Sequence, residues 1–306
     1  MQFSIFQESR RGARNSNQDR LAYCYSRDAL LMVLADGMGG HAHGEIAAEI
    51  AVQFIADAFR REARPALPDP LQFLAGAISG AHHAIVMGAA ERNLAQSPRT
   101  TCVACVVQDH AVCWTHAGDS RLYHLRDGNI VAQTKDHSRV QQLIDQGRIR
   151  EQAYGAHPER NQIFNCLGSR HPPQLDLAGM AGLCAGDTLM LCSDGLWSPL
   201  SGNIISNALQ KSGIMKAVPQ LLDQAEQRAG RECDNLSVIA MTWEEDPPAA
   251  AASRVSGSDA PVAAAVTEPQ DFSLAQAQNV DLSDEEIEHA IDDIRNAIKR
   301  KQDGKT

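Results

Sequence analysis

Short apolar runs recur through the first 246 residues, and their lengths suit strands buried in a sheet. Five of them cover residues 30–35, 101–107, 111–117, 188–193 and 236–241. Two runs end directly in Asp-Gly steps, at Asp36-Gly37 and Asp194-Gly195, and Asp234 stands just before the last run. A buried strand holds a carboxylate at its tip rigidly, and carboxylate oxygens are preferred ligands of hard divalent cations. The pattern therefore predicts a metal site, provided that these strand ends converge.

The predicted strands come in groups, and helical patterns separate the groups. Residues 101–107 and 111–117 are separated by a gap of hairpin length, and an Asp-Gly turn signal joins residues 121–125 to 130–134. Helical patterns cover residues 45–61, 70–91, 139–146 and 214–229. Hairpin-linked strands favour antiparallel sheets, with the intervening helices packed outside them. We therefore expect a layered α+β domain.

The chain changes character near residue 246. Residues 1–246 sustain apolar periodicity and are predicted to form one folded domain. Residues 247–281 are rich in Ala, Pro and Ser without a helical or strand period, so we expect a flexible linker there. A helix is predicted over residues 282–302, because Ser283 and Glu286 form a capping-box signature ahead of an apolar stripe. This helix either packs back on its own domain or docks onto a partner or a second copy.

Composition narrows the class of protein. The chain has 306 residues, 43% of them hydrophobic and 22% charged, which is ordinary for a soluble globular protein. Its formal net charge of −10 disfavours nucleic acid and anionic membranes as partners, because both attract basic surfaces. No apolar run approaches the length of a membrane span, and the N-terminus has no signal-peptide core. Eight scattered cysteines, with the Cys102 and Cys105 pair split between strand faces, favour reduced thiols in the cytoplasm.

Other polar groups accompany the three aspartates. The glycines that follow Asp36 let the backbone approach a ligand closely. Arg14 and Asp19 add a guanidinium and a fourth carboxylate near the N-terminus, and Asp119 follows Gly118 between two predicted strands. Each Asp-Gly step taken alone is a common turn, so the metal-site hypothesis depends on the whole set.

Six motifs follow one another along the chain. They are Arg14…Asn17-Gln18-Asp19, Asp36-Gly37-Met38-Gly39-Gly40, Gly118-Asp119-Ser120-Arg121, Thr134-Lys135-Asp136-His137-Ser138, Ser193-Asp194-Gly195-Leu196-Trp197 and Asp234-Asn235. Their content and order resemble the metal-dependent Ser/Thr protein phosphatases, the PPM family of type 2C, in its bacterial form. The resemblance runs from residue 3 to about residue 243 and leaves the tail unexplained. It implies a phosphatase domain over residues 1–246, folded as an αββα sandwich of two packed antiparallel β-sheets flanked by helices.

The resemblance also implies a mechanism. Asp36 would bridge two Mg²⁺ or Mn²⁺ ions. The remaining protein ligands would be the Gly37 carbonyl and the carboxylates of Asp194 and Asp234. A water bridging the ions would attack phosphoserine or phosphothreonine directly, while Arg14 holds the phosphoryl oxygens in a bidentate grip. Arg14 and Asp36 are thus the implied catalytic residues.

Two further aspartates have implied roles beside the ion pair. Asp19 would orient metal-bound water without ligating an ion itself. Asp119 would join Asp194 at a weaker third metal. From the residues alone, a turn or a salt bridge with Arg121 explains Asp119 as well.

The chain departs from the family pattern at two positions of the site. Many members, chiefly eukaryotic ones, have a His where this chain has Met38 and a Glu where it has Gln18. His41 and His43 lie just beyond the glycines and could protonate the leaving oxygen. A solvated loop histidine, or a metal-bound water acting as the acid, is the simpler interpretation, so the general acid is unassigned.

Residues 147–168 resemble the family's flap segment, which can choose substrates or gate access. Arg148, Arg150 and Arg160 can meet acidic groups beside a phosphosite, although basic loop residues are more often solvated. Trp114 and Trp197 are interpreted as core residues.

The leading hypothesis is an active cytoplasmic phosphatase that acts on phosphoproteins and opposes a Ser/Thr kinase. A pseudophosphatase that binds phosphoproteins without hydrolysing them is a second hypothesis, and the retained metal ligands argue against it. A different two-metal hydrolase would be expected to mix His with Asp ligands and to present a more basic surface. The tail helix is the candidate contact for a partner or for self-association.

Overall fold

The structure, a computed structural model, describes residues 1–38, 43–91, 94, 96–150, 154, 157–176 and 178–244. These residues form two five-stranded antiparallel sheets. The first sheet contains, in spatial order, β1 (Phe3–Arg10), β10 (Leu236–Trp243), β9 (Thr188–Cys192), β6 (Arg121–Arg126) and β7 (Asn129–Gln133). The second contains β2 (Asp19–Tyr25), β3 (Ala29–Asp36), β4 (Cys102–Gln108), β5 (Ala111–Ala117) and β8 (Ala178–Gly182).

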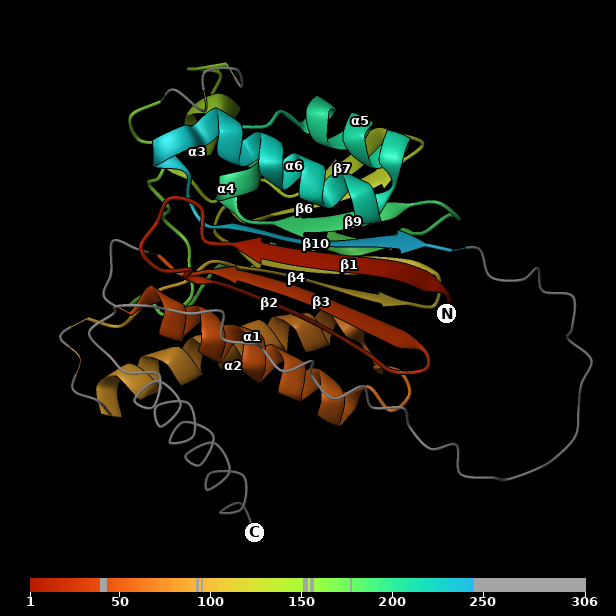
Figure 1. Cartoon of the computed structure of the whole chain (residues 1–306). Helices are drawn as coiled ribbons and strands as arrows, with labels where there is room; N and C mark the ends of the chain where they lie inside the picture. Colours follow the sequence, from red (N-terminus) through yellow and green to blue (C-terminus); the bar gives the residue numbers. More distant parts are fainter. Residues whose placement is uncertain are drawn as a thin grey trace, which may run out of the picture.

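Helices cover the outer face of each sheet (Figure 1). The second sheet is covered by α1 (Gly44–Glu62) and α2 (Pro70–Glu91). Over the first sheet lie α3 (Arg139–Asp145), α4 (Asp194–Trp197), α5 (Gly202–Ser212), α6 (Ile214–Ala229) and a short 3₁₀ turn (Gly230–Glu232). This order of layers confirms the predicted αββα sandwich.

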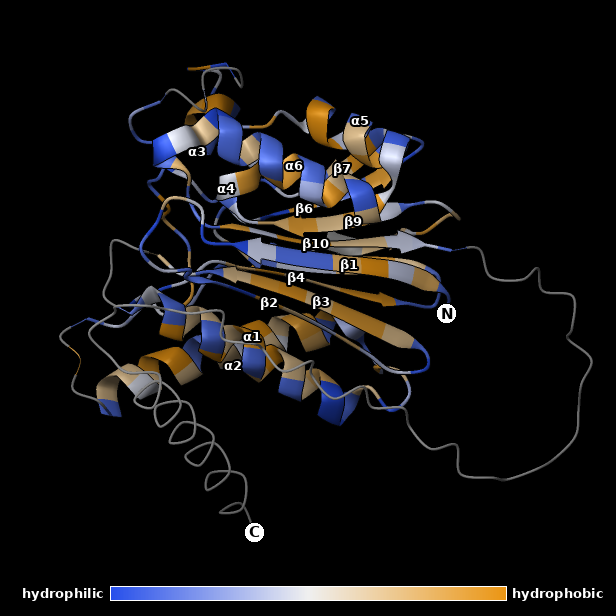
Figure 2. Ribbon diagram, viewed as in Figure 1, coloured by the Kyte–Doolittle hydropathy of each residue, from blue (hydrophilic) through white to orange (hydrophobic). Residues whose placement is uncertain are grey.

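Side chains alternate between two apolar layers along each inner strand. On β3, Leu31 and Val33 face α1 and α2, whereas Leu30 and Met32 face the other sheet. A third layer lies between the first sheet and its helices. Figure 2 shows the result: the inner strands are hydrophobic over most of their length, while the covering helices turn polar residues outward. A strand buried on both faces reads as an unbroken apolar run, which is why these strands were predictable.

The Cys102-x-x-Cys105 pair lies on β4, and its members point to opposite layers. Cys102 packs with the α1 and α2 cluster and Cys105 with the cluster between the sheets. Burial raises the pKa of the Cys102 thiol to about 12. All eight cysteines are free. The prediction of buried, unpaired thiols is confirmed for this pair.

Helix α2 is long and apolar enough, by length and composition, to cross a membrane. The sequence was expected to contain no apolar run of that length. Half of its most apolar window is buried inside the domain. Leu74, Ile78 and Ile85 belong to the cluster that α2 shares with α1 and the second sheet. Packing within the domain therefore accounts for the apolar face of α2.

The predicted linker over residues 247–281 and the predicted helix over residues 282–302 lie outside the described residues. Described structure runs to Glu244, just beyond β10. The domain boundary at residue 246 stays a prediction.

Candidate metal centre

Five aspartates from separate parts of the chain lie at one end of the sandwich, where β1 ends and β10 begins (Figure 1). Asp36 is the last residue of β3, and Asp19, the first residue of β2, is its partner across the two strands. Asp194 begins α4 directly after β9, Asp234 precedes β10, and Asp119 lies between β5 and β6. The fold thus brings to one place every aspartate that the sequence predicted for the site.

The carboxylates raise one another's pKa values. Burial and the charges of the other four aspartates raise the pKa of Asp36 well above its ordinary value. Burial and then the charge of Asp119 do the same for the pKa of Asp194. Burial raises the pKa of Asp19 to about 6, and burial followed by the charge of Asp136 raises the pKa of Asp119 to about 7. Buried negative charges need cations beside them, so the cluster suits divalent ions.

The backbone at Asp36 is fixed from both sides. Its amide donates to Thr101 Oγ1 at 3.0 Å, and its carbonyl accepts from the Thr100 hydroxyl at 2.9 Å and the Thr101 amide at 2.8 Å. A Cβ on Gly37 would lie 2.5 Å from the Gly44 backbone, so only glycine fits there. The Asp36-Gly37 step is therefore rigid, as a pair of metal ligands requires.

Asp19 is the most enclosed of the five. Its Oδ2 accepts from Ser193 Oγ at 2.8 Å, and its Oδ1 is buried without a hydrogen-bond partner in the described part of the chain. Ser193 also accepts the Ser237 amide at 3.0 Å, which ties β9 and β10 to β2. A buried oxygen without a donor is costly unless a cation or an ordered water satisfies it. This orphan oxygen therefore fits the position predicted for Asp19.

Asn235 joins the segment that carries Arg14 to the segment that carries Asp234. Its Nδ2 donates to the Arg11 carbonyl at 2.8 Å, and its Oδ1 accepts the Gln18 amide at 2.9 Å. The sequence placed Asn235 in a motif without a function of its own. Its partners are more than 200 positions away in the chain, so no local pattern could reveal them.

Arg14 lies at the edge of the carboxylate cluster. Its Nη2 is 2.6 Å from Asp234 Oδ2, and its side chain is 54% exposed. The hydrogen bond to Asp234 raises the pKa of Arg14, and the charges of Asp194 and Asp36 add to that effect. A guanidinium in this place can present two parallel N–H donors to an incoming phosphoryl group. The structure therefore puts Arg14 within the site.

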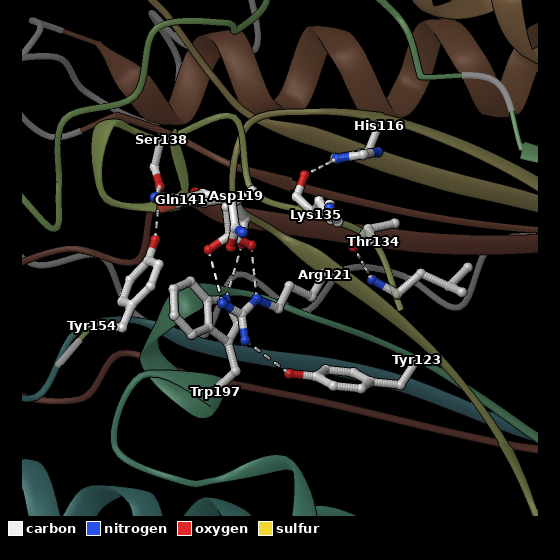
Figure 3. A network of polar contacts seen from close by, with 12 residues as sticks. His116, Asp119, Arg121, Tyr123, Thr134, Lys135, Ser138, Gln141, Tyr154 and Trp197 are labelled. Carbon is white, nitrogen blue, oxygen red and sulfur yellow. Dashed lines mark hydrogen bonds and ion pairs between the residues drawn. The ribbon is translucent and has the colours of Figure 1, made fainter. Parts of the chain in front are cut away.

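The segment around Asp119 is held by an aromatic and ionic network (Figure 3). Trp197 Nε1 donates to the Asp119 carbonyl at 2.9 Å. Arg121 forms two parallel hydrogen bonds with Asp136, both 2.8 Å long. Among the described residues Arg121 forms its ion pair with Asp136, and none is found between Arg121 and Asp119. Trp197 is buried, as predicted, and it also contacts the site.

A sequence profile described as Protein phosphatase 2C matches residues 7–232. The chain belongs to the protein phosphatase 2C family. It is 34% identical to the serine/threonine protein phosphatase PstP of Mycobacterium tuberculosis over 232 residues. These residues are 76% of this chain and 43% of that relative, so the match spans less than half of the mycobacterial protein.

Two solved structures of the family share the fold. Serine/threonine phosphatase Stp1 from Staphylococcus aureus matches with a TM-score of 0.74 at 29% identity, over 80% of this chain and 96% of that one. The catalytic domain of PstP in complex with two manganese ions matches with a TM-score of 0.68 at 32% identity, over 79% and 99%. These matches confirm the fold class drawn from the resemblance to the protein phosphatase 2C family.

One of the two departures from the family pattern, Gln18, has a local explanation. Gln18 Nε2 donates to Glu45 Oε2 at 2.8 Å. A Glu at position 18 would place a second carboxylate against Glu45, whereas the amide of Gln18 can donate to it. His43 is the N-cap residue before α1 and has a left-handed conformation with φ of 68°; its Nδ1 is 3.9 Å from Glu45 Oε1. The Met38 amide donates into the backbone, and His41 lies outside the described residues. The general acid stays unassigned.

A second group of potential ligands lies near the site. Nitrogen atoms of His116 and His137 and an oxygen of Asp176 lie within 4.8 Å of one another. The two rings are stacked, with centroids 4.4 Å apart and planes at 12°. Lone pairs of imidazole nitrogens lie in the ring planes, so parallel rings cannot direct them at one ion. His137 Nε2 instead contacts Asp176 Oδ2 at 3.2 Å. This contact joins the segment before α3 to the segment before β8.

The flap-like segment follows α3. Arg148 and Arg150 are exposed and Arg160 is half-buried. Tyr154 is buried, and its ring packs edge-on against Trp197 with centroids 5.2 Å apart. The role of the flap in substrate choice stays a prediction.

Proposed function

We propose that this chain is a metal-dependent protein serine/threonine phosphatase that hydrolyses phosphoserine and phosphothreonine in proteins. The observation that carries the proposal is the convergence of Asp36, Asp194 and Asp234 with two further aspartates in one place. Membership of the protein phosphatase 2C family supports it, as do the two manganese ions of the PstP catalytic domain.

We assign two Mg²⁺ or Mn²⁺ ions to this cluster, because all of its donors are oxygen atoms. Asp36 would bridge the two ions. The Gly37 carbonyl, Asp194 and Asp234 would supply the other protein ligands, and Asp119 with Asp194 would hold a weaker third ion. The rigid Asp36-Gly37 step suits such a set of ligands, and the raised pKa values reflect the negative charge that the ions would neutralise.

The reaction is a direct attack of water on phosphorus. When bound, the ions lower the pKa of the attacking water and neutralise charge on the phosphoryl group. Arg14 would exchange its hydrogen bond to Asp234 for two phosphoryl oxygens and so align phosphorus for attack. Asp19, whose Oδ1 has no donor among the described residues, would orient water at the site. The bond from phosphorus to the serine or threonine oxygen breaks, and the products are phosphate and the free hydroxyl.

We further propose that the chain acts in the cytoplasm on phosphoproteins and opposes a Ser/Thr kinase. The free cysteines support a reducing compartment. Residues 1–246 would form the catalytic domain, residues 247–281 a flexible linker, and residues 282–302 a helix that docks onto a partner or a second copy. Deleting residues 247–306 should leave hydrolysis of a small substrate unchanged and alter association. Loss of turnover in a folded truncation would place the tail within the catalytic unit.

The test is hydrolysis of p-nitrophenyl phosphate and a phosphothreonine peptide by the full chain. Mn²⁺ or Mg²⁺ should support turnover, EDTA should abolish it, and okadaate-type inhibitors should have no effect. Asp36→Asn should abolish turnover. Its matched control is Asp127→Asn, because Asp127 is exposed in a hairpin turn that asparagine tolerates. Turnover that persists in EDTA would contradict the proposal. Peptide binding without turnover would identify a pseudophosphatase instead.

A further inference from the structure

Trp197 connects the two aspartates to which we assign the third ion. It is the last residue of α4, a single helical turn whose first residue is Asp194. Its indole Nε1 donates to the backbone carbonyl of Asp119 at 2.9 Å. One rigid turn therefore carries the first carboxylate and, through one hydrogen bond, holds the main chain of the second.

The indole is fixed by a cation on its face. The Arg121 guanidinium carbon lies 3.5 Å from the Trp197 ring centroid. Arg121 is itself held by Asp136, whose side chain is 1% exposed, through two parallel hydrogen bonds of 2.8 Å. A guanidinium that is paired and stacked has little freedom to move. Since Arg121 follows Asp119 by two residues, the same indole holds this loop at two points (Figure 3).

Tyr154 is a further residue that packs against the indole. Its ring meets that of Trp197 edge-on, at 5.2 Å between centroids and 81° between planes. Its hydroxyl is 3.0 Å from Ser138 Oγ, and Ser138 caps the N-terminus of α3. The position of Trp197 thus depends on a residue of the flap-like segment as well as on the sheet.

The residue before Asp119 is clamped separately. The Gly118 amide donates to His137 Nδ1 at 3.2 Å, and the Gly118 carbonyl accepts the His137 amide at 2.9 Å. With Gly118 fixed, the Trp197 hydrogen bond sets the direction of the next peptide. That peptide determines where the Asp119 carboxylate lies relative to Asp194.

We propose that Trp197 is a positioning residue that sets Asp119 against Asp194 and thereby determines how tightly the third ion binds. This inference rests on the proposed function, because it takes the third ion from there. The effect of Trp197 would run through the main chain of Asp119, to which its indole donates. Its loss should weaken the third ion and leave the first two in place.

The test is a Mn²⁺ titration of the metal-free full chain, with free Mn²⁺ measured by electron paramagnetic resonance. The wild type should show two tight ions and one weak ion, and Asp119→Asn should lose the weak ion alone. Trp197→Phe keeps an aromatic ring over Arg121 and removes the N–H donor. We expect it to weaken the third ion about fivefold, the equivalent of one hydrogen bond, without changing the tight pair.

A second readout needs no metal. In the metal-free protein, Trp197→Phe should accelerate backbone hydrogen exchange in residues 118–121 and leave the rest of the sheets protected. Trp243→Phe is the matched control, because Trp243 is also buried but lies at the far end of β10. The control should move neither the weak ion nor exchange in residues 118–121. Tyr154→Leu, which keeps Trp197 itself, should weaken the third ion about twofold and covers the case in which Trp197→Phe does not fold.

Each outcome separates this inference from the proposed function. An unchanged weak ion in Trp197→Phe would overturn the inference and leave the phosphatase proposal standing. Equal weakening of all three ions would also overturn it, since the effect would then not run through Asp119. No Mn²⁺ binding by the wild type would contradict the proposed function and this inference together.

Discussion

Strand β9 joins two buried aspartate sites that differ in how their charge is satisfied. Asp187 stands at its start with no exposed surface and accepts from His124, from both nitrogens of an Arg126 fork and from the Cys184 amide. Burial alone would raise the pKa of Asp187, but these hydrogen bonds lower it below its ordinary value. Asp194 stands at the other end of β9, and its pKa is raised.

The difference distinguishes a structural carboxylate from one that awaits a ligand. At Asp187 the protein supplies a cation, Arg126, and further hydrogen-bond donors, so the charge is neutralised within the fold. Around Asp36 and Asp194 the neighbours are mostly further carboxylates, and among the described residues the cation that contacts the cluster is the half-exposed Arg14, through Asp234. Carboxylates that raise one another's pKa values are typical of functional sites. A bound divalent cation would replace the repulsion among them with attraction to the ion.

The largest effect should come from Asp36→Asn. Loss of the bridging carboxylate should lower kcat on the order of 10³-fold, the size of effect seen when one group that stabilises a charged transition state is removed. The same change should raise the melting temperature of the metal-free protein, because it removes a charge from a repulsive cluster. Steady-state kinetics and thermal unfolding in EDTA test both parts. A lower melting temperature of metal-free Asp36→Asn would contradict the contrast drawn between Asp36 and Asp187.

Asn235→Ala should have the next largest effect on activity. Asn235 makes three hydrogen bonds to the backbone of residues 11–18, which position Arg14. Their loss should raise KM for a phosphopeptide about tenfold, with a smaller change in the affinity for Mn²⁺. Asn129→Ala, at the exposed start of β7, is the control. An unchanged KM would show that the Arg14 segment does not depend on this side chain.

Asp187→Asn should destabilise the fold and leave kcat unchanged, the reverse of what we expect for Asp36→Asn. It leaves donors of His124 and Arg126 without their carboxylate, so the free energy of unfolding should fall by about 2 kcal/mol. Because the site lies at the far end of β9, kcat of the folded variant should stay at the wild-type value. Chemical denaturation and kinetics together measure this. A large fall in kcat at full metal occupancy would mean that the two ends of β9 are not independent.

The smallest effect is a pH dependence of the metal-free protein. Asp19 and Asp119 have folded pKa values of about 6 and about 7, above the ordinary 3.8. The folded state therefore binds protons more tightly than the unfolded state, and stability falls as pH rises from about 4 to about 7. Asp187, with a lowered pKa, loses its contribution only as pH falls below 3.8. Melting temperatures in EDTA should decline across pH 5 to 7 and decline less in Asp119→Asn.

The buried strands and their terminal aspartates were predictable from the sequence, whereas three of the four edge strands, β1, β2 and β8, were not. Strands β3, β4, β9 and β10 carry unbroken apolar runs because both of their faces are covered. Strands β1 and β2 are edge strands with half-exposed, mixed sequences, and β8 contains two glycines in five residues. Helix α5 was also missed, because no helical pattern was assigned to residues 202–212. Edge strands depend on their pairing partners more than on their own composition.

Within the site, the sequence identified the aspartates that come together and missed the residues that hold them in place. The aspartates follow apolar runs, which is a local signal. Ser193 contacts Asp19 across 174 positions and Trp197 contacts Asp119 across 78, so these roles exist only in the folded chain. Trp197 was assigned to the core alone, because a buried tryptophan satisfies that interpretation as well.

The most direct test of the central claim is an anomalous difference map from crystals of the full chain grown with Mn²⁺. The account predicts two peaks about 3.5–4 Å apart, both within about 2.2 Å of an Asp36 oxygen, with Asp194 and Asp234 completing the ligands. A map with no manganese at these carboxylates, at a concentration that supports turnover, would contradict it.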